Sequence, residues 1–239
     1  MGGTRPPDLH YPPTALTLGA AAMSEEALNF VLAVLDRLTP NEPLAAQQFR
    51  LRYGQGKFGK HWRRADLLTA LCAAAYFIQP GNYLEIGVLR GRSAAVVGAM
   101  CPQCDIYGFD LWIPDYAGAA NPGPDFVRGE LRGAGHSGQV QLISGDSRRT
   151  LPAFLRKHPD LYFDLITIDG DKSVLGAASD FANVLPRLKV GGILVFDDLP
   201  VAPALRRVWH KVIERDRRYV SWEFAEAKLG VAAAIRVAD

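Results

Sequence analysis

The sequence predicts an α/β protein built on a doubly wound, mostly parallel sheet of seven strands. From residue 82 onward, short apolar runs alternate with segments of helical character, a pattern that is typical of βαβ units. The runs expected to form buried parallel strands are residues 83–86, 105–109, 139–143, 163–168 and 192–196. The segments expected to form the intervening helices are residues 91–100, 124–133, 147–157, 174–188 and 203–215. Two final runs, residues 219–224 and 230–237, are joined by a short link and predict a C-terminal antiparallel hairpin at the edge of the sheet.

The first 80 residues precede this pattern and predict an N-terminal arm followed by two capping helices. Residues 1–22 contain several prolines and no apolar period, so we expect them to be extended. Ser24 and the two glutamates after it predict the start of a helix, and a second helix is expected over about residues 62–78 after a glycine-rich link. We therefore divide the chain into residues 1–80 and a domain over residues 81–239. The two helices are expected to cover the domain or to form a contact between the subunits of a homo-oligomer.

Composition and charge exclude several classes of partner. Hydrophobic residues make up 49% of the 239-residue chain and the formal net charge is +2, so no general positive field attracts nucleic acid. Basic clusters at residues 57–64 and 206–211 are expected to be solvated helix faces. The longest apolar run, residues 67–78, is shorter than the roughly 18 residues that a membrane-crossing helix needs. Because the N-terminus also lacks an apolar leader, we expect a cytoplasmic protein without membrane or nucleic-acid partners.

Cysteines give no sign of a disulfide framework or a structural metal. The pair in C-P-Q-C, residues 101–104, has no second pair to complete a zinc site. An odd total of three cysteines argues against disulfides. We expect reduced thiols in a turn.

The stretch N-Y-L-E-I-G-V-L-R-G-R-S-A, residues 82–94, predicts a strand that breaks into glycines and then starts a helix. A dinucleotide-binding fingerprint needs G-x-G-x-x-G, but Glu85 occupies the first glycine position, before Gly87 and Gly91. A carboxylate there would repel a pyrophosphate and would suit a ligand that carries an ammonium group. No Gly-Lys-Ser/Thr follows, so the turn is not a Walker A loop either. These features argue against a nicotinamide oxidoreductase.

Two further strand ends suggest a nucleoside. Asp110 ends the second predicted strand, the usual position of an acid that accepts two ribose hydroxyls. Asp146 and Ser147 end the third and are candidates for contact with an adenine edge. Acids at these positions without a pyrophosphate cradle describe a nucleoside that carries an amino acid, and S-adenosylmethionine is such a ligand.

On these residues, the sequence resembles the class I S-adenosylmethionine-dependent methyltransferases over roughly residues 82–239. The resemblance implies the Rossmann-like methyltransferase fold. It also implies that Glu85 and Gly87 lie beside the methionine end of the cofactor, and that Gly91 and Ser93 lie where a helix N-terminus receives the cofactor carboxylate. Asp110 would then bind the ribose.

Four aspartates follow the fourth and fifth predicted strands. Asp169 and Asp171 end one strand, and Asp197 and Asp198 end the next. Neighbouring parallel strands lie about 5 Å apart, so these carboxylates are expected to converge. Converging carboxylates repel one another unless a cation lies between them, and Mg²⁺ prefers such oxygen ligands. The alternative is that these acids cap the following helices or lie in solvent.

The spacing of these acids resembles that of the metal-dependent O-methyltransferases that act on natural-product sugars and aromatic hydroxyls. The resemblance implies that Asp169, Asp197 and Asp198 bind Mg²⁺ and that Asp171 is the general base. Many relatives read D-G-D-H-S-Y where this chain reads D-G-D-K-S-V, so Lys172 stands in place of a histidine. Lys172 is expected to neutralise the acids or to contact the substrate, which counts it among the candidate catalytic residues with Asp169 and Asp171.

Taken together, the sequence predicts an S-adenosylmethionine-dependent methyltransferase (EC 2.1.1.-) that acts on a hydroxyl of a small molecule with the help of Mg²⁺. Substrate selection is expected in the long link over residues 111–138, where Trp112, Tyr116 and Phe126 would stack on the substrate or pack the link against the sheet. His136 in this link is expected at the surface. Two alternatives stay open: a metal-independent methyltransferase that acts on nitrogen or on a macromolecule, and a cofactor-binding interaction protein without catalysis.

Overall fold

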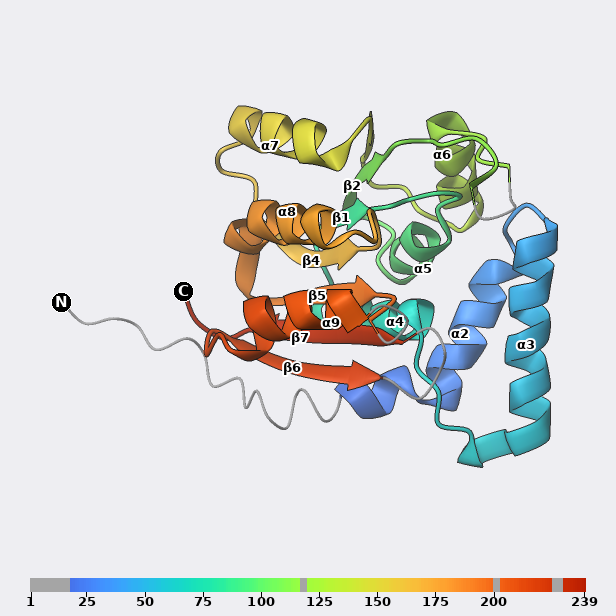
Figure 1. Ribbon diagram of the computed structural model, residues 1–239. Helices are drawn as coiled ribbons and strands as arrows, with labels where there is room; N and C mark the ends of the chain where they lie inside the picture. Colours follow the sequence, from blue (N-terminus) through green and yellow to red (C-terminus); the bar gives the residue numbers. More distant parts are fainter. Residues whose placement is uncertain (1–17, 117–119, 200–202, 225–229) are drawn as a thin grey trace.

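A seven-stranded sheet forms the centre of the protein, seen here in a computed structural model that describes residues 18–116, 120–199, 203–224 and 230–239. The strand order is β3-β2-β1-β4-β5-β7-β6 (Figure 1). Strands β1 to β5 pair in parallel, whereas β7 is antiparallel to both β5 and β6. The predicted doubly wound sheet with a C-terminal antiparallel hairpin is confirmed.

From residue 82 onward, the bounds of the elements agree closely with the predicted ones. The strands are β1 (Asn82–Ile86), β2 (Asp105–Asp110), β3 (Val140–Ser144), β4 (Phe163–Ile168), β5 (Leu188–Asp197), β6 (Tyr219–Phe224) and β7 (Val231–Arg236). The helices between them are α5 (Arg92–Met100), α6 (Pro124–Gly133), α7 (Ser147–Lys157), α8 (Val174–Val184), the 3₁₀ turn η3 (Leu185–Arg187), α9 (Pro203–Trp209) and the π-helical turn η4 (His210–Glu214). The N-terminal helices are α2 (Glu25–Leu35), α3 (Glu42–Phe58), the 3₁₀ turn η1 (Gly59–His61) and α4 (Leu67–Ile78).

Alternation of side chains along the central strands divides the core into two layers. Leu165 of β4 and Ile193 of β5 belong to one buried cluster, which also contains residues of α2, α4 and α5. Their neighbours Ile166 and Leu194 belong to the other, with residues of α7, α8 and α9. Successive side chains of a strand point to opposite faces, so a strand covered on both sides must be apolar throughout. This explains why the sequence shows continuous apolar runs here.

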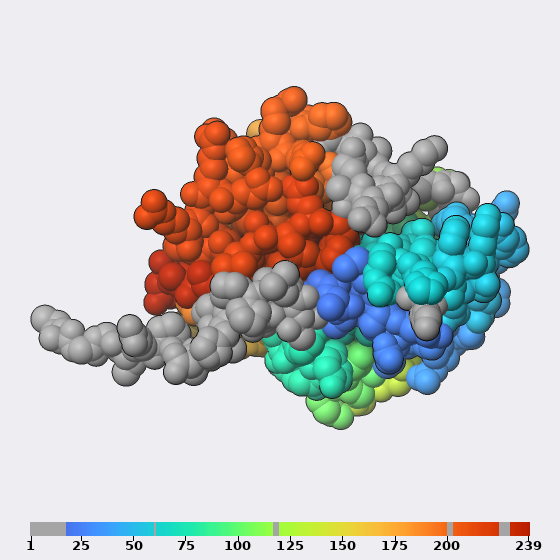
Figure 2. Space-filling model, turned by 90° about the horizontal axis from the view of Figure 1, so that it is seen from below, coloured from blue at the N-terminus to red at the C-terminus, as the bar shows by residue number. Residues whose placement is uncertain are grey.

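The N-terminal region differs from the prediction at its start and in having a third helix, α3, between the two that were expected. Residues 18–22 are helical, not extended, and Gly19 lies against the Phe224 ring, where an added Cβ would be 3.8 Å away. Figure 2 shows this start of the described chain beside the C-terminal hairpin. The expected glycine-rich link is instead part of α3, which continues through Gly54 because the Trp62 ring packs there, at 2.2 Å from where a Cβ would be. The rest of the expected arm, residues 1–17, lies outside the described residues.

Capping residues set where the N-terminal helices begin. Ser24 accepts a hydrogen bond from Ala27 N at 3.1 Å, which confirms the expected start of α2. Asp66 and Thr69 form a capping box, so α4 begins at Leu67, later than predicted. The proposed division at residue 80 falls between α4 and β1. Within the described parts of the chain, no helix combines the length and the apolar character needed to cross a membrane.

The cysteines and His136 lie in the interior. Cys72, Cys101 and Cys104 are free and buried, and burial raises the pKa of each thiol. The expected surface position of His136 is wrong: its side chain is buried, and Nε2 lies 2.7 Å from the backbone oxygen of Cys104. This contact ties the residues after α6 to the turn before β2.

Candidate functional site

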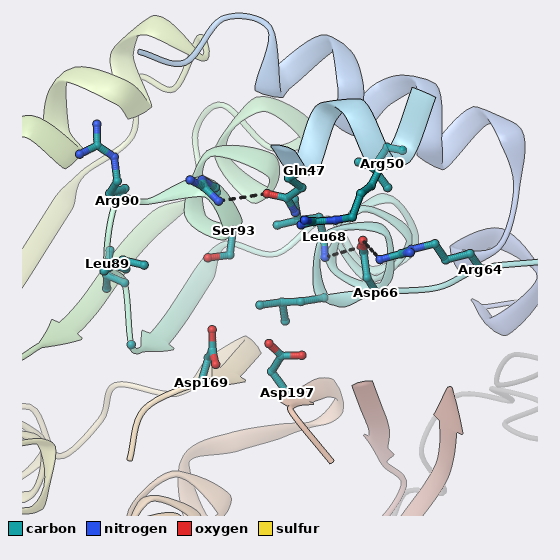
Figure 3. Close-up of a pocket in the computed structure, with 15 residues that line it drawn as sticks. Gln47, Arg50, Arg64, Asp66, Leu68, Leu89, Arg90, Ser93, Asp169 and Asp197 are labelled. Atoms are coloured by element: carbon teal, nitrogen blue, oxygen red, sulfur yellow. Dashed lines mark hydrogen bonds and ion pairs between the residues drawn. The ribbon is translucent and has the colours of Figure 1, made fainter. Parts of the chain in front are cut away.

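The carboxyl ends of β1, β4 and β5 open into a cleft of about 230 Å³ that the N-terminal region covers (Figure 3). Its roof comes from α3 and from the segment that leads into α4, through Gln47, Arg50, Arg64 and Asp66. Its floor and inner wall come from the turn after β1, the start of α5, Asp169 and Asp197. Ligands of doubly wound sheets bind at such strand ends, where the order of the strands reverses.

Two positions in the turn after β1 require glycine. Gly87 has φ +89°, and a Cβ there would lie 2.2 Å from the backbone oxygen of Asp169. Gly91 has φ +75°, and a Cβ there would lie 2.8 Å from Val127. L-residues rarely adopt such φ values, so the sequence can make this tight turn only with glycine. The turn therefore passes directly over the end of β4.

Asp110 at the end of β2 holds this turn in shape. Its Oδ2 accepts hydrogen bonds from Val88 N at 2.8 Å and Leu89 N at 2.7 Å, and its Oδ1 accepts one from Trp112 N at 2.6 Å. These bonds support Leu89 at φ +51°, which is unusual for a leucine. A carboxylate has about four acceptor positions, so roughly one is left for an outside donor such as a ribose hydroxyl.

Glu85 is buried below the turn. One carboxylate oxygen accepts a hydrogen bond from Ser93 Oγ of α5, and the other has no partner among the described residues. Burial raises the pKa of Glu85 to about 8. A buried acceptor without a partner is costly, and an ammonium donor would relieve that cost.

The residues expected near adenine take part in local contacts. Asp146 caps α7 through Arg148 N at 3.0 Å and pairs with the Arg148 side chain, which holds the pKa of Asp146 below its usual range. Ser147 Oγ donates to Asp180 Oδ1 at 2.8 Å. Both follow β3, whose Ser144 is opposite Asp110, so they lie at the same edge of the sheet without lining the cleft.

Three aspartates meet at the floor of the cleft because of strand register. Ile168 of β4 is opposite Phe196 of β5, so the next residues, Asp169 and Asp197, are neighbours. Oxygens of Asp169, Asp197 and Asp198 all lie within 4.8 Å of one another. Burial first, and then the neighbouring carboxylates, raise the pKa of Asp197 to about 8. Three hard oxygen donors at this spacing fit a divalent cation such as Mg²⁺.

Lys172 lies within this acid cluster and Asp171 does not. Lys172 Nζ pairs with Asp169 and, at 3.1 Å, with Asp198. Burial lowers the pKa of Lys172, but the two carboxylates outweigh burial and the net pKa is raised. Asp171 is exposed and accepts hydrogen bonds from Ser173 N at 2.8 Å and Ser173 Oγ at 2.9 Å.

The aromatic residues of the long link mostly pack inside the protein. Trp112 Nε1 donates to Ser144 Oγ at 2.9 Å, and the Phe126 ring lies 4.4 Å from the Arg90 guanidinium. Tyr116 is 47% exposed and is free to contact a ligand. Of the three, Tyr116 is therefore the residue that is left available to contact a ligand.

Sequence reasoning missed the roof of the cleft. Arg50, Arg64 and Arg92 line it, although Arg64 belongs to a basic cluster that we expected to be a solvated face. No spacing rule links these arginines to the strand ends. The one signal was that two N-terminal helices were expected to cover the domain, but α3, which carries Arg50, was not one of them.

A protein-family model described as a methyltransferase domain matches residues 84–199, which span the glycine turn and the acid cluster. These residues form an S-adenosylmethionine-dependent methyltransferase domain. Among curated protein sequences, none gives a significant match.

Solved structures of other methyltransferases share this fold. The calicheamicin methyltransferase CalS11 is 23% identical, with a TM-score of 0.57, and the match covers 90% of this chain and 92% of that chain. TomG of Streptomyces achromogenes, an O-methyltransferase of tomaymycin synthesis solved with S-adenosylmethionine, is 16% identical, with a TM-score of 0.58 and coverage of 95% and 96%. Podospora anserina PaMTH1, solved with S-adenosylhomocysteine, is 18% identical, with a TM-score of 0.56 and coverage of 99% of both chains.

Because Glu85 is buried, we expect the unfolding free energy of the cofactor-free methyltransferase to depend on pH. Because the folded-state pKa is raised to about 8, the contribution of protonated Glu85 is fully present below its ordinary pKa of 4.5 and is lost as the pH rises through about 8. Relative to Glu85→Gln, whose amide stays neutral, the wild type should lose up to about 1.4 kcal/mol of unfolding free energy per pH unit between pH 4.5 and about pH 8, and the loss should level off above that pH. Urea unfolding over a pH series measures this difference. Asp197 titrates in both proteins and cancels, so parallel curves would contradict the assignment.

Proposed function

We propose that this methyltransferase transfers the methyl group of S-adenosylmethionine to a hydroxyl of a small molecule, with the help of Mg²⁺. The convergence of Asp169, Asp197 and Asp198 beside the glycine turn carries this proposal. Structural neighbours named for calicheamicin and tomaymycin chemistry support a small-molecule acceptor.

The cofactor would lie across the turn after β1. The unpartnered oxygen of Glu85 suits the ammonium of the methionine part, with Gly87 leaving room for its approach. Gly91 and Ser93 at the start of α5 would lie beside the carboxylate, and Asp110 would accept a ribose hydroxyl. Asp146 and Ser147 would lie toward the adenine.

Asp169, Asp197 and Asp198 would hold the Mg²⁺ ion. When bound there, a divalent cation supplies positive charge that stabilises the negative charge developing on an acceptor oxygen. Lys172 now compensates two of these carboxylates, so its ammonium would have to share them or move aside. The cleft residues would hold the acceptor oxygen in line with the methyl group, at a distance of about 3–3.5 Å.

Asp171 would accept the proton of the acceptor hydroxyl. It is exposed and lies on the same loop as Asp169 and Lys172, and each of its oxygens, which now accepts one hydrogen bond from Ser173, keeps a second acceptor position for a proton. Lys172, which is paired with carboxylates that raise its pKa, would act as a positive charge and not as a base. A positioned base of this kind is worth roughly 10²–10⁴ in rate.

One observation favours the alternative of a metal-independent methyltransferase. The Lys172 ammonium already provides the positive charge that the acid cluster needs, and it does so from within the chain. An enzyme of this kind, acting on nitrogen or on a macromolecule, would have no need for Mg²⁺. No described contact favours a non-catalytic binding protein.

We also propose that the protein forms a homo-oligomer and is located in the cytoplasm. The outer face of α3 exposes Phe49, Tyr53 and Phe58, which supports a homo-oligomer formed through the N-terminal helices and testable from the mass of the protein in solution. The three free thiols support a reducing, cytoplasmic location. The net charge of +2 gives no support to a nucleic-acid partner.

A measurement of Mg²⁺ binding distinguishes the two candidate functions, and it can be made before the methyl acceptor is known. Calorimetric titration of Mg²⁺ into protein saturated with S-adenosylhomocysteine should show one site, and Asp198→Asn should weaken it by about tenfold or more, since a tenfold change corresponds to about 1.4 kcal/mol. Lys172→Met should tighten it, because the competing ammonium is gone. Asp125→Asn, which changes an aspartate with a 98% exposed side chain, is the matched control. A wild type that binds no Mg²⁺ would contradict the metal proposal and favour the alternative.

The base is tested once screening finds an acceptor among hydroxylated small molecules. Asp171→Asn should lower kcat by about 10²–10⁴, because the amide cannot take the proton. Affinities for S-adenosylhomocysteine and for Mg²⁺ should stay as in the wild type. An unchanged kcat in radiolabelled methyl transfer would remove Asp171 from this role.

A further inference from the structure

Charge is divided unevenly across the cleft. Four arginines and three aspartates line it. Asp169 and Asp197 lie on the floor, and the guanidinium groups of Arg50 and Arg64 extend from the roof toward the same space (Figure 3). The cleft is therefore acidic below and basic above.

Arg92 has only neutral partners in the described structure. Its guanidinium donates to Gln47 Oε1 at 3.1 Å and to Asn41 Oδ1 at 3.0 Å. Burial, together with the like charges of Arg90 and Arg50, lowers the pKa of Arg92. Its hydrogen bonds are satisfied in part, but its charge is not balanced by a carboxylate.

Arg64 retains donors that no described residue takes up. Its closest carboxylate oxygen belongs to Asp66, at 3.6 Å, and that carboxylate already accepts from Leu68 N and Thr69 N at the start of α4. Arg64 Nε is buried without a hydrogen-bond partner. The side chain as a whole is 28% exposed and lines the cleft, so its guanidinium can donate to an anionic ligand there.

Arg50 adds a third guanidinium to the roof. It is exposed, lines the cleft from α3, and forms no ion pair with any of the described residues. Arg52, two positions along the same helix, instead pairs with Asp36 at 2.6 Å on the outside. Asp36 at the end of α2 therefore pairs with the arginine of α3 that faces away from the cleft, whereas no described carboxylate pairs with Arg50, which faces into it.

We propose that Arg50, Arg64 and Arg92 form an anion-binding roof, which holds a carboxylate or phosphate group of a bound ligand opposite the acid cluster. The proposal rests on the cleft being the cofactor and acceptor site proposed above. It specifies in addition that a ligand bound there carries a negatively charged group. The planar guanidinium matches carboxylate and phosphate oxygens in pairs, and several converging arginines favour an anion that balances their charge. Two ligands can bring such a group: the cofactor, through its own carboxylate, or an acceptor that carries an anionic substituent.

Three binding titrations on the same variants distinguish these sources. The variants are Arg50→Gln and Arg64→Gln, with Arg52→Gln as the control on the outer side of α3. The ligands are S-adenosylhomocysteine, 5′-methylthioadenosine, which lacks the amino-acid part, and inorganic diphosphate added to protein saturated with S-adenosylhomocysteine. Thermal unfolding of each variant checks that the fold is intact.

If the roof binds the cofactor carboxylate, the cleft variants should bind S-adenosylhomocysteine about tenfold more weakly and 5′-methylthioadenosine unchanged. If it binds an anionic acceptor, S-adenosylhomocysteine affinity should stay the same, and diphosphate binding, present in the wild type and in Arg52→Gln, should weaken by about tenfold. Unchanged affinities for all three ligands, or equal losses for S-adenosylhomocysteine and 5′-methylthioadenosine, would overturn the proposal. None of these titrations depends on Mg²⁺ or on methyl transfer, so a failure of the proposed reaction would not be mistaken for a failure of the roof.

Discussion

The close approach of Gly87 to the backbone of Asp169 is the constraint on which the rest of the site depends. A side chain at position 87 would occupy the space of the Asp169 carbonyl, so the turn after β1 and the end of β4 fit together only because this residue is glycine. Asp110 then fixes the turn from the other side through the backbone N–H groups of Val88 and Leu89. As a result, the part of the fold that receives a cofactor and the part that carries the acid cluster are held as one unit.

Charge within that unit is only partly balanced by the protein itself. Lys172 pairs with Asp169 and Asp198, but Glu85 keeps an oxygen without a partner among the described residues, and Arg50 and Arg92 of the roof form no ion pair with a described carboxylate. Buried or half-buried charges of this kind cost stability unless a ligand completes them. Incompletely paired charged groups are common at binding and catalytic sites of proteins, and in this chain they lie in and beside the cleft.

The sequence allowed the sheet and the floor of the site to be predicted because both depend on local pattern and strand order. Continuous apolar runs mark strands buried on both faces, and acids directly after two such strands must converge when the strands are parallel neighbours, as Asp169 and Asp197 do. The roof depends on packing between distant residues. Trp62 against Gly54 lets α3 continue where glycines suggested a link, and α3 in turn carries Arg50 to the cleft. His136 was likewise misjudged because its partner, the Cys104 carbonyl, is remote in sequence.

We expect the cleft at the carboxyl ends of β1, β4 and β5 to bind S-adenosylmethionine through the turn that Gly87 and Asp110 shape. Calorimetric titration of the wild-type protein with S-adenosylhomocysteine, the product form of that cofactor, tests this claim most directly. We expect a single site for S-adenosylhomocysteine with a dissociation constant on the order of micromolar, equivalent to about 8 kcal/mol of binding free energy. No heat of binding together with no thermal shift would contradict it, and would leave the glycine turn as a structural feature or the site of a different ligand.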